Sequence, residues 1–324
     1  MKKYLITGYS GFVARHFLNY LESLGEECVI LGVDINEPDS EGVAYKYLQC
    51  SFQRVDLLEK KQVQRLLCDF HPNYILHLAS YSSVAYSWDN PVSAFVNNSN
   101  IFLNLVDQVR VLQLKCRILS IGSSEEYGNV SAESLPLRED TPTNPTSPYA
   151  VARVSQEMLS RVYALSYGID IVLTRSFNHI GAGQKEVFVI SSFAKKLVDI
   201  KNADGLFNEL RVGNIDLLRD FVDVRDVVRA YFLLLYRGEK GEIYNICSGK
   251  GHALRDILLQ MMNILDLDVP IIEDKALIRP SENKVIIGSY KKIQRELGWE
   301  PLIPIQDSLK DIIHYWSSKT GGLE

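Results

Sequence analysis

The sequence predicts an α/β fold in which a doubly wound parallel sheet is followed by a smaller C-terminal α/β lobe. Short apolar runs alternate with amphipathic helical segments across residues 1–176, the pattern of a parallel sheet covered on both faces. The first apolar run, at Tyr4–Ile6, leads into a turn that contains Gly8 and Gly11 and then into a helix over Phe12–Leu24. A strand, a glycine turn and a helix in this order open a dinucleotide-binding unit.

The glycine turn predicts a seat for a pyrophosphate. Glycine lets the backbone approach an anion closely, and the following helix N-terminus offers free N–H groups with partial positive charge. Ala14 stands at the third small position of the dinucleotide fingerprint, a replacement that the fingerprint allows. The apolar run 27–33 then ends at Asp34, 20 residues after Ala14, where an acidic side chain binds the adenosine ribose. The competing interpretation is an ordinary turn, with Asp34 on a surface loop.

A carboxylate at the ribose also bears on the choice of cofactor. Asp34 would repel a 2′-phosphate, so it favours NAD(H), while NADP(H) stays open.

The other elements of residues 1–176 follow in order. The chain from Asp34 to Ser51 is polar and predicted to be irregular, and apolar residues at helical spacing predict a helix within 54–67. Asp56 precedes that helix and either caps it or reaches the adenine. The run 73–80 predicts a buried strand that ends in small residues, leaving room for a ligand. We expect further strands at 116–123 and 168–176 and long helices at 92–113 and 148–167.

Beyond Ser176 the pattern loosens and predicts the smaller lobe, residues 177–324, with parts of 215–247 returning to complete the sheet domain of residues 1–176. We expect a loop at 177–184, one strand followed by a turn and a helix between 210 and 235, and a strand at 243–248. Further predicted helices are 187–201, 253–265, 290–297 and 305–317, and 278–282 is predicted to be a polar loop.

Composition narrows the class of protein. A formal net charge of -5 over 324 residues, without a basic run, gives no support for a nucleic-acid partner. No apolar run reaches the roughly 18 to 20 residues that span a bilayer, and no metal-ligand spacing is present. The five cysteines are odd in number and widely spaced, so we expect reduced core residues in a cytoplasmic protein.

A serine, a tyrosine and a cation follow the predicted sheet strands. Strand 116–123 ends at Ser123 in IGSSEEYG, and SPYAVAR places Tyr149 and Arg153 four residues apart, on one face of a helix. Two hydroxyl groups can hold a carbonyl group, and a tyrosine can exchange its proton while a nicotinamide exchanges a hydride. Because a tyrosine phenol ionises only near pH 10 in water, a neighbouring cation is needed to stabilise the phenolate. The alternative is a packing tyrosine beside a solvated arginine.

These motifs resemble the extended short-chain dehydrogenase/reductase superfamily. TGYSGFVA, HLAS, IGSSEEYG and SPYAVAR are superfamily signals. RSFNHIGAGQ, VGNIDLLRDFVDVRDVV and IRPSE are similar to the GDP-6-deoxy-D-mannose reductases, which act on GDP-4-keto-6-deoxy-D-mannose, and the resemblance covers nearly the whole chain. It implies a dinucleotide-binding Rossmann domain, a nucleotide-sugar substrate linked to GDP, and a homodimer built on helices 92–113 and 148–167.

The resemblance also implies a role for each matching residue. The implied cofactor contacts are Gly8, Gly11, Phe12, Val13, Asp34, Asp56, Leu57, Ala79, Asn98, Tyr149 and Arg153. The implied substrate contacts are Ser123, Asn178, Val189, Lys195, Arg219 and Arg279. Arginine forks suit phosphate oxygens in a chain without a basic patch, whereas ion pairs of the two arginines with Asp220 or Glu282 are the structural alternative.

Two positions depart from the expected reductase. The superfamily has lysine where this chain has Arg153, which keeps the charge but is longer and planar. Glu125 follows the Ser123–Ser124 pair, and related 4,6-dehydratases use a glutamate there to remove the C5 proton. The leading interpretation is therefore a C4 keto-reductase of a nucleotide-linked 4-keto-6-deoxy sugar. A dehydratase or epimerase with tightly bound NAD, and a non-catalytic nucleotide-binding homologue, are the alternatives.

Overall fold

The computed structural model describes residues 1–39, 44–203, 209–278 and 283–320 and contains a seven-stranded sheet in which every neighbouring pair of strands is parallel. The strand order is β10-β6-β5-β4-β1-β2-β3. The prediction of a doubly wound parallel sheet is confirmed. The strands are β1 (Lys2–Thr7), β2 (Cys28–Asp34), β3 (Leu48–Arg54), β4 (Tyr74–His77), β5 (Arg117–Ser123), β6 (Asp170–Ser176) and β10 (Ile243–Ile246).

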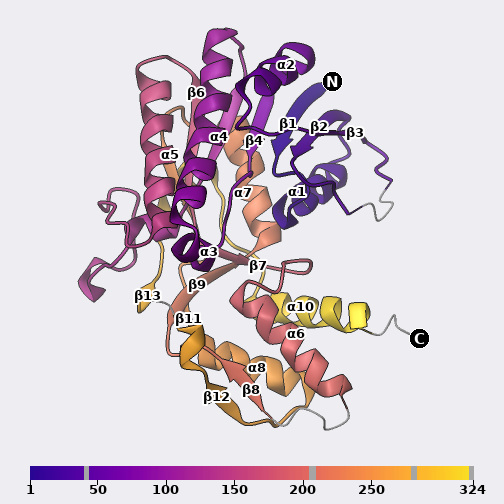
Figure 1. Ribbon diagram of the computed structural model, residues 1–324, viewed down its shortest axis with the longest axis vertical. Coiled ribbons are helices and arrows are strands. Elements are labelled where there is room, and N and C mark those ends of the chain that lie inside the picture. Colours follow the sequence, from indigo (N-terminus) through magenta and orange to yellow (C-terminus); the bar gives the residue numbers. More distant parts are fainter. Residues whose placement is uncertain (40–43, 204–208, 279–282, 321–324) are drawn as a thin grey trace.

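Helices cover both faces of this sheet (Figure 1). One buried cluster joins the sheet to α1 (Phe12–Ser23), α7 (Val224–Arg237) and α9 (Lys291–Leu297). A second cluster joins the other face to α2 (Lys60–Phe70), α4 (Pro91–Val111) and α5 (Pro148–Leu165). A short helix, α3 (Val84–Asp89), precedes α4. Because all strands are parallel, their carboxyl ends meet at one edge, where ligands of such sheets bind.

The lower part of Figure 1 holds a smaller α/β lobe with its own apolar core. Its sheets consist of β7 (Asn178–Ile180), β9 (Leu218–Asp223), β11 (Gly251–Ala253) and β13 (Val285–Ile286), and of β8 (Leu210–Val212) paired with β12 (Ile271–Glu273). The core packs α6 (Val189–Asn202), α8 (Leu254–Leu265) and α10 (Ile305–Thr320) together. The chain crosses between the two parts repeatedly, since β10 and α7 belong to the main sheet layer. The division of the chain at residue 176 stays a prediction.

Several local predictions are wrong. The segment before Ser51 is not wholly irregular, because β3 begins at Leu48 and runs to Arg54, and the helix begins only at Lys60. The 177–184 segment contains β7, and two strands, not one, precede α7. The cysteines are free, as expected, but Cys50 and Cys68 are exposed and so are not core residues. The predicted loop at 278–282 lies outside the described residues except for Ile278.

Candidate active site

The glycine turn after β1 has the shape of a phosphate cradle. Gly8 has a φ of +69° and lies so close to β4 that a Cβ would be 2.7 Å from the backbone nitrogen of Ala79. Gly11 is the N-cap of α1 and supplies no side-chain cap, so the N–H groups of Phe12 and Val13 open the helix without a capping oxygen. A positive φ, a close approach and an uncapped helix N-terminus fit a bound pyrophosphate.

Asp34 is the last residue of β2 and lies beside this turn. Its carboxylate accepts hydrogen bonds from the backbone nitrogens of Ser10, at 3.2 Å, and Asn36, at 3.0 Å. The carboxylate is therefore held at the carboxyl edge of the sheet, where the ribose of a dinucleotide lies. Arg54 is the register partner of Asp34 on β3 and is exposed, so a cation stands next to the acidic position.

Asp56 and Leu57, the residues expected at the adenine, follow β3. The Asp56 carboxylate accepts the N–H of Leu58 at 2.9 Å, which closes a turn and does not cap α2, whose N-cap is Glu59. Leu57 is buried at 5% exposure. Helix capping by Asp56 is therefore excluded, and its contact with adenine stays a prediction.

The carboxyl end of β4 lines the same edge. The Thr7 hydroxyl accepts the N–H of Ala79 at 3.2 Å, which fixes the strand end against β1. Asn98, on α4, is fully buried, and its side chain exchanges hydrogen bonds with the backbone of Tyr81 at 2.8 and 3.1 Å. Asn98 thus shapes the loop after β4. Whether it or Ala79 touches a cofactor stays a prediction.

Tyr149 and Arg153 are in contact on α5. Both lie on α5 and are buried, with exposed fractions of 6% and 5%. Arg153 Nε donates a hydrogen bond to the Tyr149 hydroxyl oxygen at 3.2 Å, and the guanidinium carbon lies 5.3 Å from the centre of the tyrosine ring. A cation that donates to the phenol oxygen can stabilise the negative charge that develops there while a proton is exchanged.

Neutral acceptors hold the guanidinium of Arg153 in place. Nη1 donates to the carbonyl oxygen of Ile121 at 3.0 Å and to Gln156 Oε1 at 2.8 Å, and Nη2 donates to the Ser80 hydroxyl. Gln156 in turn donates to Ser120 Oγ at 2.9 Å. Sequence reasoning missed Gln156 as a contact of Arg153, although a residue three positions along the same helix lies on the same face.

Ser123 ends β5, two residues after the carbonyl group that Arg153 contacts. Its hydroxyl oxygen accepts the N–H of Glu125 at 3.2 Å, and its own N–H donates to Glu126 Oε1 at 2.6 Å, a capping box at the short 3-10 turn Ser124–Tyr127. Glu125 is half-buried on this turn. Ser123 and Glu125 thus follow closely after Ile121, the β5 residue to which Arg153 is hydrogen-bonded.

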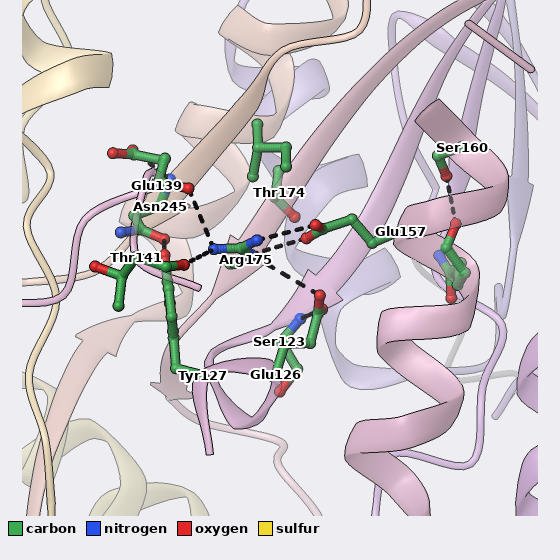
Figure 2. Close-up of polar contacts among 12 residues, drawn as sticks. Ser123, Glu126, Tyr127, Glu139, Thr141, Glu157, Ser160, Thr174, Arg175 and Asn245 are labelled. Carbon is green, nitrogen blue, oxygen red and sulfur yellow. Dashed lines mark hydrogen bonds and ion pairs between the residues drawn. The ribbon is translucent and has the colours of Figure 1, made fainter. Parts of the chain in front are cut away.

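Behind Ser123 lies a buried ionic cluster that the motifs did not indicate (Figure 2). Arg175, on β6, donates to both carboxylate oxygens of Glu157 at 2.8 and 2.9 Å. Glu126 Oε2 lies 3.9 Å from Arg175 Nε, and the Tyr127 ring lies under the guanidinium at 4.6 Å. The sequence offered one signal, a charged residue inside an apolar strand, which must be paired when buried.

The residues expected to bind substrate are spread over the smaller lobe. Asn178 lies on β7 and is the register partner of Phe221 on β9. Arg219, also on β9, donates to the carbonyl oxygens of Leu218 and Lys284 at 3.0 and 3.3 Å. The remaining expected contacts are Val189, the first residue of α6, Lys195, which pairs with Asp199 at 3.3 Å and Glu186 at 3.7 Å, and Arg279, which lies outside the described residues.

Asp220, the alternative partner of Arg219, already accepts hydrogen bonds from other groups. The Asp220 carboxylate accepts the N–H groups of Ser248, Gly249 and Gly288 at 2.8, 2.9 and 3.1 Å, and burial raises its pKa to about 6. Asp220 therefore joins β9 to two neighbouring loops. Glu282, the alternative partner of Arg279, lies outside the described residues.

The model of the family described as "GDP-mannose 4,6 dehydratase" matches residues 5–312. The chain is 33% identical over 323 residues to "GDP-6-deoxy-D-mannose reductase" of Pseudomonas aeruginosa, and the match covers 98% of each chain. The chain belongs to this family. It is thereby a member of the extended short-chain dehydrogenases/reductases, which are NAD(P)-dependent enzymes.

Relatives with other printed activities are also similar. "GDP-mannose 4,6-dehydratase" of Vibrio cholerae serotype O1 is 26% identical over 308 residues, covering 86% of this chain and 80% of the relative. The solved structure of RMD from P. aeruginosa complexed with NADPH superposes with a TM-score of 0.85 at 32% identity, covering 98% and 100% of the two chains. UDP-glucose 4-epimerase of Thermus thermophilus, complexed with NAD, gives 0.84 at 28% identity, covering 99% and 100%.

None of the helices within the described ranges is long and apolar enough to cross a membrane. No group of three or more His, Cys, Asp or Glu side chains among these residues is arranged to hold a metal ion.

Proposed function

We propose that this protein is an NAD(P)H-dependent reductase of the C4 keto group of a nucleotide-linked 4-keto-6-deoxy sugar, converting GDP-4-keto-6-deoxy-D-mannose to GDP-6-deoxy-D-mannose. The observation that carries the proposal is the 3.2 Å hydrogen bond from Arg153 to the Tyr149 hydroxyl at the ligand edge of the sheet. The similarity over 98% of the chain to a GDP-6-deoxy-D-mannose reductase supports the choice of reaction and substrate.

Each catalytic residue has a defined task in this proposal. A bound reduced nicotinamide supplies the hydride to the sugar C4. Ser123 donates its O–H to the C4 carbonyl oxygen, because its oxygen already accepts the Glu125 N–H and the hydroxyl hydrogen remains for the substrate. Tyr149 transfers its proton to the same oxygen, and Arg153 stabilises the phenolate that is left.

The arginine at the usual lysine position is compatible with this mechanism. Ser80, Ile121 and Gln156 receive its donors, so within the described part of the chain the planar group is fixed by neutral oxygens and by no carboxylate. Its charge is then available to the Tyr149 oxygen. We propose that Arg153 serves as the catalytic cation.

The finer cofactor and substrate assignments are part of the proposal. The carboxylate of Asp34 favours NADH, whereas the exposed Arg54 beside it would favour a 2′-phosphate. Comparing kcat/KM for NADH and NADPH in the parent and in Asp34→Ala tests this preference. We expect the variant to gain activity with NADPH, and an unchanged ratio of the two cofactors would contradict the role of Asp34.

The proposed contacts to the sugar nucleotide are Asn178, Val189, Lys195, Arg219 and Arg279, with the two arginines on the diphosphate. Loss of affinity for GDP in Arg219→Gln, measured by calorimetry, would support the phosphate contact. Equal affinity of parent and variant would reject it.

A dehydratase is the second candidate, and Glu125 is the observation that favours it. Its N–H donates a hydrogen bond to Ser123 Oγ, and its side chain is half-buried on the turn that follows Ser123. Dehydratases of the same family are also among the relatives. A glutamate at this place can remove a proton from the sugar.

One assay distinguishes these functions. The protein is mixed with GDP-4-keto-6-deoxymannose and NADH or NADPH, the absorbance of the reduced cofactor is followed, and the product sugar is identified. One equivalent of cofactor oxidised per sugar supports the reductase. A sugar altered without net oxidation, or GDP-mannose converted in a parallel reaction, supports a dehydratase or epimerase. Binding without turnover of either sugar means a non-catalytic homologue.

We further propose a homodimer built on the outer faces of α4 and α5. Apolar side chains are exposed along both helices, with Val92 75%, Val151 43%, Val162 49% and Leu165 70% accessible. Paired with a second copy, these faces would be covered. Sedimentation as a monomer at micromolar concentration would contradict the dimer. A cytoplasmic location also stays a prediction.

A further inference from the structure

Two carboxyl groups share one cation behind the catalytic serine (Figure 2). Glu126, Glu157 and Arg175 are buried, with exposed fractions of 0%, 4% and 3%. Arg175 is already paired with both oxygens of Glu157, and its Nε lies 3.9 Å from Glu126 Oε2. One guanidinium compensates one carboxylate, so two buried negative charges would leave one without compensation.

Glu126 has the contacts of a neutral carboxylic acid. Its Oε1 accepts the N–H of Ser123 at 2.6 Å, while none of the described residues donates a hydrogen bond to its Oε2. Glu157 Oε2 and Glu126 Oε2 lie 2.8 and 3.9 Å from the same nitrogen, Arg175 Nε, so a proton on one of the two carboxyl groups would relieve their repulsion. Burial, together with the neighbouring Glu157, raises the pKa of Glu126. Burial opposes ionisation of Glu157 as well, but the hydrogen bonds from Arg175 hold the pKa of Glu157 below its usual value.

The backbone leaves space for this carboxyl group. A Cβ on Gly122 would lie 2.4 Å from Glu126 Oε1 and 2.4 Å from the carbonyl oxygen of Thr174, so only glycine fits at that position with Glu126 in place. Three other titratable groups surround the cluster. The Tyr127 ring lies on the Arg175 guanidinium, and the backbone carbonyl oxygen of Glu139 accepts a hydrogen bond from Arg175 at 3.4 Å. The positive charge of Arg161 helps to lower the pKa of Glu157.

We propose that Glu126 is a positioning residue for Ser123: a neutral acid that donates its proton to Glu157 and holds the Ser123 N–H with its carbonyl oxygen. Through the same turn it orients Glu125. The inference rests on the proposed function, because it concerns the serine that holds the substrate carbonyl.

The test compares two replacements of similar size. Glu126→Met removes the acceptor of the Ser123 N–H, and we expect kcat to fall 10- to 100-fold while KM for the reduced cofactor changes less than twofold. Glu126→Gln keeps that acceptor and donates to Glu157 in place of the acid proton, so we expect kcat to return to within about fivefold of the parent. A Gln variant as slow as the Met variant, or a Met variant as fast as the parent, would overturn the inference.

Two measurements do not depend on turnover. Infrared spectroscopy of protein with isotope-labelled glutamate should show a protonated carboxyl group at pH 7 that disappears in Glu126→Gln, and its absence from the parent would reject the neutral acid. In the double variant Glu126→Gln, Glu157→Gln, Arg175 has no carboxylate in the cluster. The midpoint of thermal unfolding should then fall by more than the sum of the two single shifts, and additive shifts would contradict a shared proton. An inactive parent would reject the proposed reductase. The infrared and unfolding measurements would still test whether Glu126 is a neutral acid.

Discussion

Two buried arginines lie near the end of β5 and differ in what receives their charge. Arg175 is bound through two nitrogens to the carboxylate of Glu157, whereas Arg153 donates to neutral oxygens of Ser80, Ile121 and Gln156 and to the Tyr149 hydroxyl. Among the described residues, none forms an ion pair with Arg153. Their exposed fractions, 3% and 5%, are nearly equal, so burial does not separate them.

In the proposed mechanism, this difference in partners separates a structural charge, on Arg175, from a catalytic one, on Arg153. A guanidinium that is fully paired stabilises its own carboxylate and has little field left for a reacting group. A guanidinium held by neutral dipoles keeps its field directed at the Tyr149 oxygen, where negative charge develops as the proton leaves. Such a site costs stability, because a buried cation without an anion is only partly solvated. That cost is expected where the charge is used in a reaction.

Removing the Tyr149 hydroxyl, to which Arg153 donates a hydrogen bond, should have the largest effect on catalysis. Tyr149→Phe keeps the ring and deletes the proton donor, so we expect kcat to fall by roughly 10²- to 10⁴-fold. Thermal unfolding should change little, because among the described residues the deleted hydroxyl is hydrogen-bonded to Arg153 alone. The measurement is cofactor oxidation with saturating sugar nucleotide. A Phe variant within tenfold of the parent would mean that another group delivers the proton.

The two arginines should respond oppositely to the same replacement. Arg175→Met leaves Glu157 buried without its cation, and we expect a loss of about 3–5 kcal/mol in the free energy of unfolding. Arg153→Met leaves only neutral groups and should cost far less stability, while kcat falls by about two orders of magnitude, or ~2.7 kcal/mol of barrier. Urea unfolding and kcat are measured on both variants.

The comparison fails if the two variants lose stability equally. It also fails if Arg175→Met, while still folded, loses as much activity per folded molecule as Arg153→Met.

The two sites also differ in how far the sequence could predict them. The pair of Tyr149 and Arg153 follows from a four-residue spacing on one helix, a local pattern that sequence shows directly. The Arg175 cluster joins α5, β6 and the turn after β5, and no local pattern specifies which distant carboxylates meet one arginine. The sequence indicated only that Arg175 stands in an apolar strand, where a charged side chain must be paired.

The same distinction explains the errors in the fold. Central strands were predicted well because they are short apolar runs, as in β5, and helices because their apolar residues recur at helical spacing, as in α8. β3 was missed because it is an edge strand in which Leu48 is the single buried residue, so its apolar signal is weak. β7 was missed because its three residues form a strand only by pairing with β9, some 40 positions along the chain. Cys50 lies on β3 and was misplaced for the same reason.

A carboxylate placed beside Arg153 should make it resemble Arg175. Gln156→Glu keeps the oxygen that accepts Arg153 Nη1 at 2.8 Å and adds a negative charge. We expect kcat to fall about tenfold, the equivalent of ~1.4 kcal/mol, because the guanidinium field at the Tyr149 oxygen is partly cancelled. Gln156→Met is the matched control, since it removes the acceptor without adding charge, and it should be the faster of the two variants. Equal rates would show that position 156 acts by packing alone.

The smallest change in rate is expected when the cation is kept and its shape altered. Arg153→Lys retains a positive charge within reach of the Tyr149 hydroxyl but gives up the planar group that bonds Ser80, Ile121 and Gln156 together. We expect kcat to stay within about tenfold of the parent, less than ~1.4 kcal/mol of barrier, and Gln156→Glu to slow the Lys variant as it slows the parent. Steady-state rates on the four combinations form a double-mutant cycle. A rise in kcat of several orders of magnitude in Arg153→Lys would show that the natural arginine disables the site, and the neutral shell around Arg153 would then be a packing solution without a catalytic purpose.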